Sequence, residues 1–310
     1  MRRDALGAGL AAVIFWGLSP VATRAAVPHL SPLPLLLIRM AAASLVLLPW
    51  ALPVFRRLRP RSAGRLLAAG FLGLVGYNLP VTAGLRLLPA ASAGLLLATE
   101  PVWMLLLARL FLGERGGARS WLGSAVALTG VAVLAGPGAA SGAGGYRALA
   151  GTGLVLAGTL AFAGYTIVMR PLSAEFGAVP ATAATTVAGS LPYLAAAGTL
   201  PGAGLAHLGP VVWAEIAFLA LAATAAGMLL WNVAVLAGGA ARVGLLLYLE
   251  PAVSVLGAAV FLRERITLVI IGGGLLILAG VATAATGGIH GPAVSPDGLA
   301  HSCGPAEHNE

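Results

Sequence analysis

Residues 93–115 read AGLLLATEPVWMLLLARLFLGER, and residues 243–265 read VGLLLYLEPAVSVLGAAVFLRER. The two stretches align without a gap at an offset of 150, and 12 of their 23 positions are identical. Both contain a Glu-Pro pair, Glu100-Pro101 and Glu250-Pro251, and both end in Glu-Arg. Shared apolar composition alone does not place two Glu-Pro pairs and two Glu-Arg pairs in register. The chain therefore contains an internal duplication.

The composition places this duplication in a membrane. Hydrophobic residues make up 59% of the 310 residues, charged residues only 9%, and the mean hydropathy is +0.96. Soluble proteins carry about 25% charged residues, so this chain has too few polar groups to cover a surface in water. All 18 basic residues are arginine, and they lie in short gaps between apolar runs rather than in a stripe. The pattern excludes a nucleic-acid-binding surface and predicts that the chain is dissolved in the lipid bilayer.

Ten windows are long and apolar enough to span a membrane, which takes about 20 residues per helix. They cover residues 5–26, 33–54, 66–86, 90–112, 119–136, 148–169, 178–199, 210–236, 240–262 and 266–286. The sequence thus predicts an all-α integral membrane protein with ten transmembrane helices. Each copy of the duplication holds five of them, and five is odd. The second copy is therefore expected to enter the bilayer upside down, which gives two inverted five-helix repeats.

The same pattern divides the chain into segments. We expect a cytoplasmic N-terminus (1–4), a first five-helix repeat (5–137), a linker (138–147), a second repeat (148–287) and a disordered cytoplasmic tail (288–310). The first window also has features of a cleaved signal peptide, but its counterpart in the second half favours a retained span. Cys303 is the chain's one cysteine, which excludes an intramolecular disulfide. With only His301 and His308 near it in the tail, no metal site and no cofactor are predicted.

The distribution of arginine predicts that both termini lie in the cytoplasm. With the N-terminus inside, 11 arginines face the cytoplasm and 5 face outside. The cluster from Arg56 to Arg65 decides the orientation, because short loops near span ends dominate the positive-inside rule. The absence of lysine beside abundant alanine, glycine, arginine and proline is typical of a GC-rich bacterial genome. The expected location is therefore the plasma membrane, specifically a bacterial inner membrane.

Two five-span halves that each end in an E-P-(x)12-E-R helix and a Gly-rich last helix resemble the EamA-type transporters of the drug/metabolite transporter superfamily. The resemblance covers about residues 5–286, and its most specific part lies in the fourth and ninth helices. It implies a ten-helix secondary carrier, many of which export amino acids or other small metabolites. It implies no particular substrate.

Glu100 and Glu250 are the first candidates for a functional site. Each lies about midway along its span, where a charge costs about 2.5–3.5 kcal/mol on insertion scales. Such carboxylates are expected to face a water-filled cavity, and burial there disfavours the charged form, so they can exchange protons. The alternative is a structural hydrogen bond across helices. Pro101 and Pro251 each remove one helical hydrogen bond and are expected to kink the helix, either for gating or as a fixed packing feature.

Asn78 and Asn232 occupy matched places in the two halves, and each follows an aromatic residue, Tyr77 or Trp231. Their amides are expected to contact a substrate or, equally, to hydrogen-bond between helices. The aromatic rings are expected in the cavity wall. Trp16 and Tyr165 lie one position apart when the halves are aligned; they are further candidates for the wall, with anchoring at the membrane interface as the alternative.

Arg39 has no charged counterpart in the second half, where Thr185 and Thr186 occupy the matching region. Its guanidinium can hold a substrate carboxylate through two parallel hydrogen bonds. It can also pair with a membrane glutamate or reach the outer interface. The Glu114-Arg115 and Glu264-Arg265 pairs are expected to cap the following helix or to form interfacial ion pairs.

These features predict a secondary transmembrane transporter that moves a small-molecule substrate by proton coupling or exchange. A channel or a non-transporting membrane scaffold is the alternative, and a membrane-embedded enzyme is less favoured. The chain has no HExxH motif and no Ser/His/Asp set, so no enzyme is predicted. The absence of a GxxxxGK[ST] motif disfavours an ATP-driven pump. The sequence leaves open whether a homodimer forms.

Overall fold

The computed structural model describes residues 3–112, 115–135, 143–199, 204–238, 243, 245–286 and 289–290. Residues 138–142 of the predicted linker, Glu114, and the predicted tail apart from Ile289–His290 lie outside this part of the chain, as do Cys303 and both tail histidines. Residues 143–147, also predicted as linker, are helical instead. The described residues are almost entirely helical.

The first half contains five helical passes. They are formed by α1 (Arg3–Ala26), α2 (Pro32–Arg56), the continuous series α3 (Pro60–Gly70), η1 (Phe71–Gly76) and α4 (Tyr77–Gly84), the pair α5 (Ala90–Leu97) and α6 (Glu100–Leu112), and α7 (Ala118–Ala135). Two of these passes are irregular: η1 is a π-helical segment inside the third, and α5 and α6 are separate helices within the fourth.

The second half repeats this pattern over the described residues. It contains α8 (Ala143–Phe176), α9 (Ala178–Ala195), the series α10 (Pro210–Ala217), η6 (Phe218–Ala226) and α11 (Gly227–Gly238), then η7 (Leu245–Leu249) with α13 (Glu250–Phe261), and α14 (Leu268–Ala285). The short 3-10 turns η3 (Ala197–Thr199) and η5 (Leu205–His207) connect α9 to α10. The segment η6 is again π-helical, at the same place in the third pass.

Eight described helical segments are long and apolar enough to cross a membrane. They are Leu6–Ala26, Pro32–Arg56, Pro60–Gly84, Ala90–Phe111, Ala118–Ala135, Gly145–Phe176, Pro210–Val235 and Leu268–Ala285. The described residues of the other two predicted spans are helical but do not reach this threshold. The first contains α9, which carries several threonines; the second contains the shorter apolar helix Leu246–Phe261. The chain is thus an all-helical, multi-pass membrane protein.

Two local features differ from the expectation. The arginine-rich stretch 56–65 was predicted as a separator, but α3 begins at Pro60 and carries Arg61 and Arg65 on its first turns. Proline is favoured in the first helical turn because its missing N–H has no partner to lose there. Ile289–His290, predicted in a disordered tail, form the two-residue strand β2, which pairs antiparallel with β1 (Arg115–Gly116).

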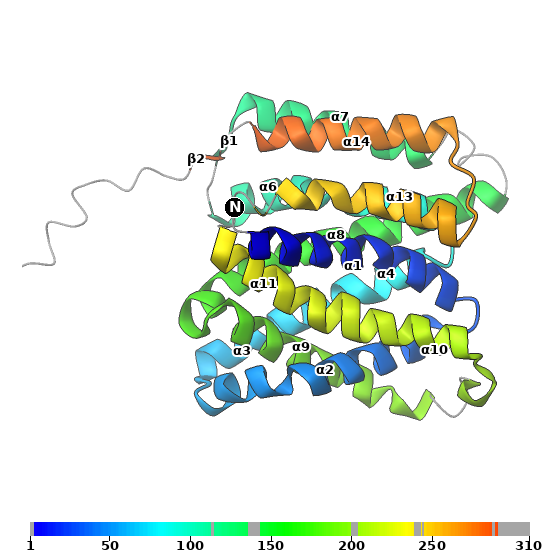
Figure 1. Cartoon of the computed structure of the whole chain (residues 1–310). Coiled ribbons are helices and arrows are strands. Elements are labelled where there is room, and N and C mark those ends of the chain that lie inside the picture. The colour runs from blue at the N-terminus through cyan, green and yellow to red at the C-terminus, as the bar shows by residue number, and fades with distance from the viewer. Residues whose placement is uncertain are drawn as a thin grey trace, which may run out of the picture.

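The helices run side by side through the bundle, with α7 and α14 along one edge and α2 packed against α9 near the opposite edge (Figure 1). Large apolar side chains point outward from many of these helices; Leu45 on α2 is 73% exposed and Leu268 on α14 is 85% exposed. Such a surface suits lipid rather than water. The N-terminal end of α1 lies at the same end of the bundle as α3 and β1 (Figure 1).

Glycines allow α7 and α14 to approach closely. A Cβ atom at Gly130 would lie 2.6 Å from the carbonyl oxygen of Gly273, and one at Gly280 would lie 2.6 Å from the carbonyl oxygen of Gly123. Because the obstructing atoms are backbone, they cannot rotate away. Inside a membrane the hydrophobic effect does not drive helices together, because lipid tails are as apolar as the helix surfaces. Small residues at such a contact let the helices associate through close van der Waals packing instead.

Replacing Gly280 by valine should therefore force α7 and α14 apart and lower the stability of the protein. Overpacking costs about 1–3 kcal/mol, and we expect a lower thermal unfolding midpoint in detergent for Gly280→Val. Gly272→Val on the same helix is the matched control, because a Cβ at Gly272 meets nothing within 4 Å. Equal midpoints for the two variants would contradict the proposed close contact.

Candidate functional site

A cavity of about 620 Å³ lies among helices from both halves of the chain. Its volume falls within the range of about 300–1,000 Å³ that small-molecule sites occupy. All eleven residues selected from the sequence line it: Trp16, Arg39, Tyr77, Asn78, Glu100, Pro101, Tyr165, Trp231, Asn232, Glu250 and Pro251. These residues come from seven helices, α1, α2, α4, α6, α8, α11 and α13, and meet only in three dimensions.

The Glu-Pro motifs mark helix beginnings rather than kinks. Glu100 is the first residue of α6, and α5 has already ended at Leu97; Glu250 is the first residue of α13 and follows the 3-10 segment η7. In place of the predicted kink, a two-residue break precedes Glu100, and the helix changes from 3-10 to α at Glu250. Proline is tolerated in a first turn, where no hydrogen bond to its nitrogen is required, so each Glu-Pro pair starts a new helix.

Both carboxylates lie half-buried against the cavity without a protein partner. Within the described part of the chain, no side chain or backbone N–H donates a hydrogen bond to either of them. Each instead occupies the first turn of a helix, where the helix dipole favours negative charge. Discontinuous helices with charged groups at the break are typical of carrier binding sites. The arrangement leaves both carboxylates available to a proton or to a cationic group in the cavity.

Arg39 lies on α2 and faces the same cavity. Its Nε donates a hydrogen bond to the Thr224 hydroxyl, 3.0 Å away in the π-helical segment η6 of the other half. Among the described residues its guanidinium makes no ion pair with a glutamate, so this alternative is not what the structure shows. The bond to Thr224 orients the guanidinium across the boundary between the halves and keeps its terminal nitrogens available to a ligand.

The π-helical segments explain why polar side chains are needed beside the cavity. A π-turn leaves backbone carbonyls out of the α-helical pattern, and such turns are frequent at functional sites. Asn78 Nδ2 donates to the Gly73 carbonyl at 3.1 Å, and Thr224 donates to the Leu219 carbonyl at 2.8 Å, both five residues back. The two side chains thus satisfy carbonyls within η1 and η6.

The two asparagine amides donate hydrogen bonds within their own helices rather than between helices. Asn232 Nδ2 donates to the Met228 carbonyl at 2.8 Å, just as Asn78 Nδ2 donates to Gly73. These bonds fix the amide planes beside the cavity. The donor nitrogens are thereby partly used, and each carbonyl oxygen remains the group that can accept a hydrogen bond from a ligand.

Aromatic rings form two matched walls. Trp16 lies 5.3 Å from Trp231 between ring centroids, and its indole N–H donates to the Ala223 carbonyl at 2.9 Å. On the other side, Tyr77 lies 5.0 Å from Phe162, which lies 5.4 Å from Tyr165. Each wall joins the first pass of one half to the third pass of the other.

Several lining residues were not selected from the sequence. Phe162 and Tyr248 complete the aromatic lining, and four methionines also face the cavity: Met40, Met104, Met169 and Met228. They are all the methionines of the chain apart from Met1. Flexible, polarizable methionine is common at binding surfaces that adapt to different ligands. The sequence shows that methionine is rare and occurs inside the chain at only these four positions. That the four side chains meet at one cavity depends on the fold.

The Glu-Arg pair at the end of α13 also behaves differently from the expectation. The Glu264 carboxylate accepts hydrogen bonds from the backbone N–H groups of Ala90 and Ala91, at 2.8 and 3.1 Å. It therefore caps α5 in the first half rather than the following helix α14. This contact joins the segment that follows α13 to the start of α5 in the other half. The matching Glu114 lies outside the described residues.

The comparisons with known proteins identify a transporter family and several transporter relatives. Residues 5–136 and residues 149–286 each match the family described as the EamA-like transporter family. A protein of Archaeoglobus fulgidus named "Uncharacterized transporter" is 28% identical over 272 residues, which cover 87% of this chain and 94% of that protein. A "Probable terminal-alkyne amino-acid exporter" of Streptantibioticus cattleyicolor is 32% identical over 273 residues, covering 87% and 89%.

A solved crystal structure has the same fold. It aligns with 92% of this chain and 97% of its own length with a TM-score of 0.63, at 21% sequence identity. At this identity the likeness concerns the arrangement of the helices alone. It shows that the chain's helices follow an architecture already seen in a crystal.

A thiol probe should distinguish the cavity from the lipid-facing surface. Ser19 lines the cavity and is half-buried, whereas Leu45 is 73% exposed on the outer face of α2. With Cys303 replaced by serine and the protein in lipid nanodiscs, a charged thiol reagent should modify Ser19→Cys roughly tenfold faster than Leu45→Cys, because a reactive thiolate forms in water and not in hydrocarbon. Faster modification of Leu45→Cys would contradict a water-filled cavity.

Proposed function

Because the chain belongs to the EamA-like transporter family, we propose that it is a secondary carrier that exports small metabolites, amino acids or related compounds, by proton coupling or exchange. The observation that carries the proposal is the pairing of opposite charges around one cavity. Two carboxylates without a protein partner and one guanidinium face a space of about 620 Å³. A compound with an amino group, a carboxylate and a modest apolar portion complements this lining.

The apolar lining supports such a substrate. Four methionines and several aromatic rings surround the charged groups, so the side chain of a substrate meets adaptable apolar surface. The carboxylate of the substrate would bind the Arg39 guanidinium, which presents parallel donors. The relative from Streptantibioticus cattleyicolor, named for amino-acid export, is in keeping with this class. The cavity is built from one chain, so transport by this route needs no second copy.

Proton coupling is proposed for Glu100 and Glu250. Burial beside apolar residues favours the protonated carboxyl, whereas the first turn of a helix favours the carboxylate. Groups under such opposed influences can take up a proton on one side and release it on the other. The cationic end of the substrate and the proton would then compete for the same carboxylates, which gives exchange of one for the other.

Ten membrane-spanning helices in two inverted repeats form the proposed framework. Each contact between the halves has an equivalent contact with the halves interchanged. The α1–α11 contact corresponds to the α8–α4 contact, and the α1–α13 contact corresponds to the α8–α6 contact. The contacts α2–α9 and α7–α14 join equivalent helices. A twofold relation between the halves produces this set of contacts, and five passes per half make that relation an inversion in the membrane.

We further propose that both termini face the cytoplasm of a bacterial cell and that the carrier lies in its inner membrane. The arginine cluster at 56–65 lies at the same end of the bundle as the N-terminal end of α1 (Figure 1). Arginine-rich short loops remain on the cytoplasmic side. The opposite end carries the turn around His207 and would face outside.

The first test of function compares metabolite pools inside and outside cells with and without the gene. We expect one class of small amphiphilic metabolite to accumulate outside when the wild-type carrier is present. Its outside concentration should exceed its inside concentration. Glu100→Gln and Glu250→Gln preserve the shape of the side chain but abolish protonation, and each should reduce the export. Glu215→Gln is the matched control, because Glu215 lies on α10 and not in the cavity lining.

The metabolite identified in this way then allows a test of coupling in liposomes with an imposed pH gradient. One glutamine substitution should remove most of the pH dependence of transport and the other should remove less, since Arg39 lies in only one half and acts unequally on the two carboxylates. Wild-type rates and an unchanged pH profile in both variants would contradict coupling. Equilibration without accumulation against a gradient would indicate a channel.

Labelling of single cysteines tests the orientation. In a Cys303→Ser background, Gly64→Cys and His207→Cys place thiols at exposed positions at the two ends of the bundle. A membrane-impermeant maleimide should label His207→Cys in intact cells and Gly64→Cys only after permeabilisation, as the positive-inside rule requires. Protein that is solubilised before labelling provides the reactivity control. The reverse pattern would overturn the proposed orientation.

A further inference from the structure

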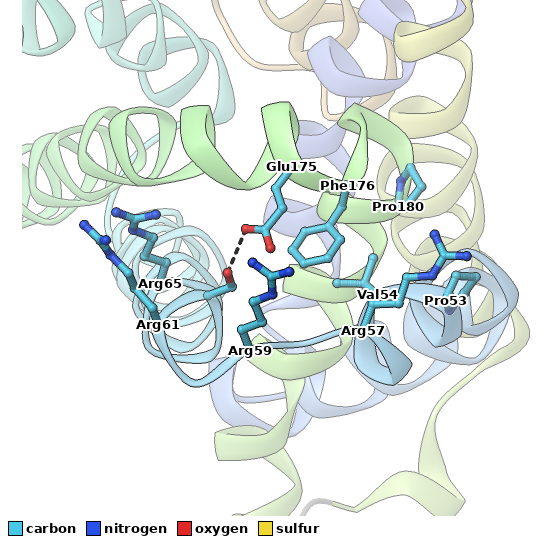
Figure 2. A pocket seen from close by; sticks show the side chains of 10 residues that line it. Pro53, Val54, Arg57, Arg59, Arg61, Arg65, Glu175, Phe176 and Pro180 are labelled. Carbon is cyan, nitrogen blue, oxygen red and sulfur yellow. Dashed lines mark hydrogen bonds between the residues drawn. The ribbon is translucent and has the colours of Figure 1, made fainter. Parts of the chain in front are cut away.

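A second pocket of about 650 Å³ lies outside the central cavity, at the end of the bundle that holds the N-terminal end of α1. It opens where α2 ends, α3 begins and α8 ends. Figure 2 shows its lining, in which the Arg59 guanidinium lies beside the carboxylate of Glu175, and Arg57, Arg61 and Arg65 extend on either side. The proposed transport does not use this pocket.

The pocket carries an excess of positive charge. Four arginines line it, Arg57, Arg59, Arg61 and Arg65, against the one carboxylate of Glu175. That carboxylate already accepts a hydrogen bond from the buried Ser62 hydroxyl at 2.7 Å. Within the described residues, none of the four guanidinium groups makes a hydrogen bond or ion pair. The hydrogen-bond donors of these four guanidinium groups therefore have no partner among the described residues.

The arginines are arranged around the pocket rather than along one side. Figure 2 shows the guanidinium of Arg59 between Glu175 and Phe176, with Arg61 and Arg65 on one flank and Arg57 on the other. Guanidinium groups match phosphate oxygens because their planar forks donate two parallel hydrogen bonds. An anion with several oxygens can therefore contact more than one of these side chains at once.

The remaining lining is apolar and borders the lipid-facing surface. Pro53, Val54, Phe176 and Pro180 form it. On the helices that supply this lining, Leu52 of α2 is 40% exposed and Leu67 of α3 is 58% exposed. A ligand with a phosphate at the water boundary and hydrocarbon beside it fits such a neighbourhood. The positive-inside rule accounts for arginines near span ends, but it does not require them to line a pocket with apolar walls.

We propose that this pocket binds the headgroup phosphate of an anionic phospholipid in the leaflet at the arginine-rich end, which is the cytoplasmic leaflet in the orientation proposed above. The charge complementarity selects an anionic headgroup over a zwitterionic one, and basic clusters at this depth are drawn to the negative surface of the membrane. The bound lipid would add a link between the ends of α2, α3 and α8, which already pack through a buried apolar cluster that includes Val54, Leu66 and Leu172.

Native mass spectrometry of the full-length protein in detergent tests the proposal directly. With equal amounts of phosphatidylglycerol and phosphatidylcholine, the wild-type protein should retain phosphatidylglycerol preferentially. The Arg59→Gln/Arg65→Gln double variant should bind it at least about fivefold more weakly, because one arginine near an anionic surface contributes about that factor. The Arg86→Gln/Arg147→Gln variant removes the same charge at exposed positions at the other end of the bundle and should bind as the wild type does.

Equal retention of both lipids, or equal loss in both double variants, would overturn the proposal. Inorganic phosphate alone distinguishes a free anion from a lipid: displacement of phosphatidylglycerol by millimolar phosphate would show a site for free phosphate instead. Should the pocket variant fail to fold, the wild-type melting midpoint provides the test. Phosphatidylglycerol should raise it above the value in phosphatidylcholine, and about 1 M salt should abolish the difference by screening; no difference at low salt would overturn the proposal.

Discussion

Inside a bilayer every backbone N–H and C=O needs a partner within the protein, because hydrocarbon offers none. Continuous helices meet this requirement by themselves, and most passes of the chain are continuous. Four helical stretches are irregular. The π-helical segments η1 and η6 interrupt two of them, a two-residue turn before Glu100 interrupts the third, and a change from 3-10 to α-helix at Glu250 interrupts the fourth. Irregular backbone at this depth is tolerated only where it lines a cavity or is buried in protein, and all four irregular stretches contribute residues to the lining of the central cavity.

The polar residues of the cavity thus serve the backbone as well as a ligand. Asn78 and Thr224 satisfy carbonyls of the π-helical segments, and Thr224 also accepts the hydrogen bond from Arg39. A ligand that binds Arg39 would act on a group that is already connected to an irregular helix of the other half. The same polar network therefore connects ligand binding to the segments whose helical pattern is least regular.

The two halves are equivalent in their contacts but not in their charges. Glu100 and Glu250 occupy matched helix starts, whereas Arg39 is matched by Thr185 and Thr186. Both threonines are fully buried, and their hydroxyls donate to carbonyls of their own helix at 2.9 to 3.0 Å. The first half thus places a cation at the cavity, whereas the second half has buried threonine hydroxyls that bond to the backbone of their own helix. This asymmetry separates the environments of two otherwise equivalent carboxylates.

Sequence periodicity and the internal repeat by themselves determined the membrane class, the family resemblance, the approximate helix bounds and the residues whose polarity is unusual in a span. Polar groups in hydrocarbon stand out without a structure because they are costly there, which is why Glu100, Asn78 and Arg39 could be selected. The tertiary structure alone decided that α5 ends before Glu100, that Glu264 caps α5 across the halves, and that the internal methionines meet at the cavity. Apolar residues carry no such mark, and their place depends on how each helix is rotated against partners more than 100 residues away. That rotation is set by close contacts such as Gly123 with Gly280, which only the packed bundle contains.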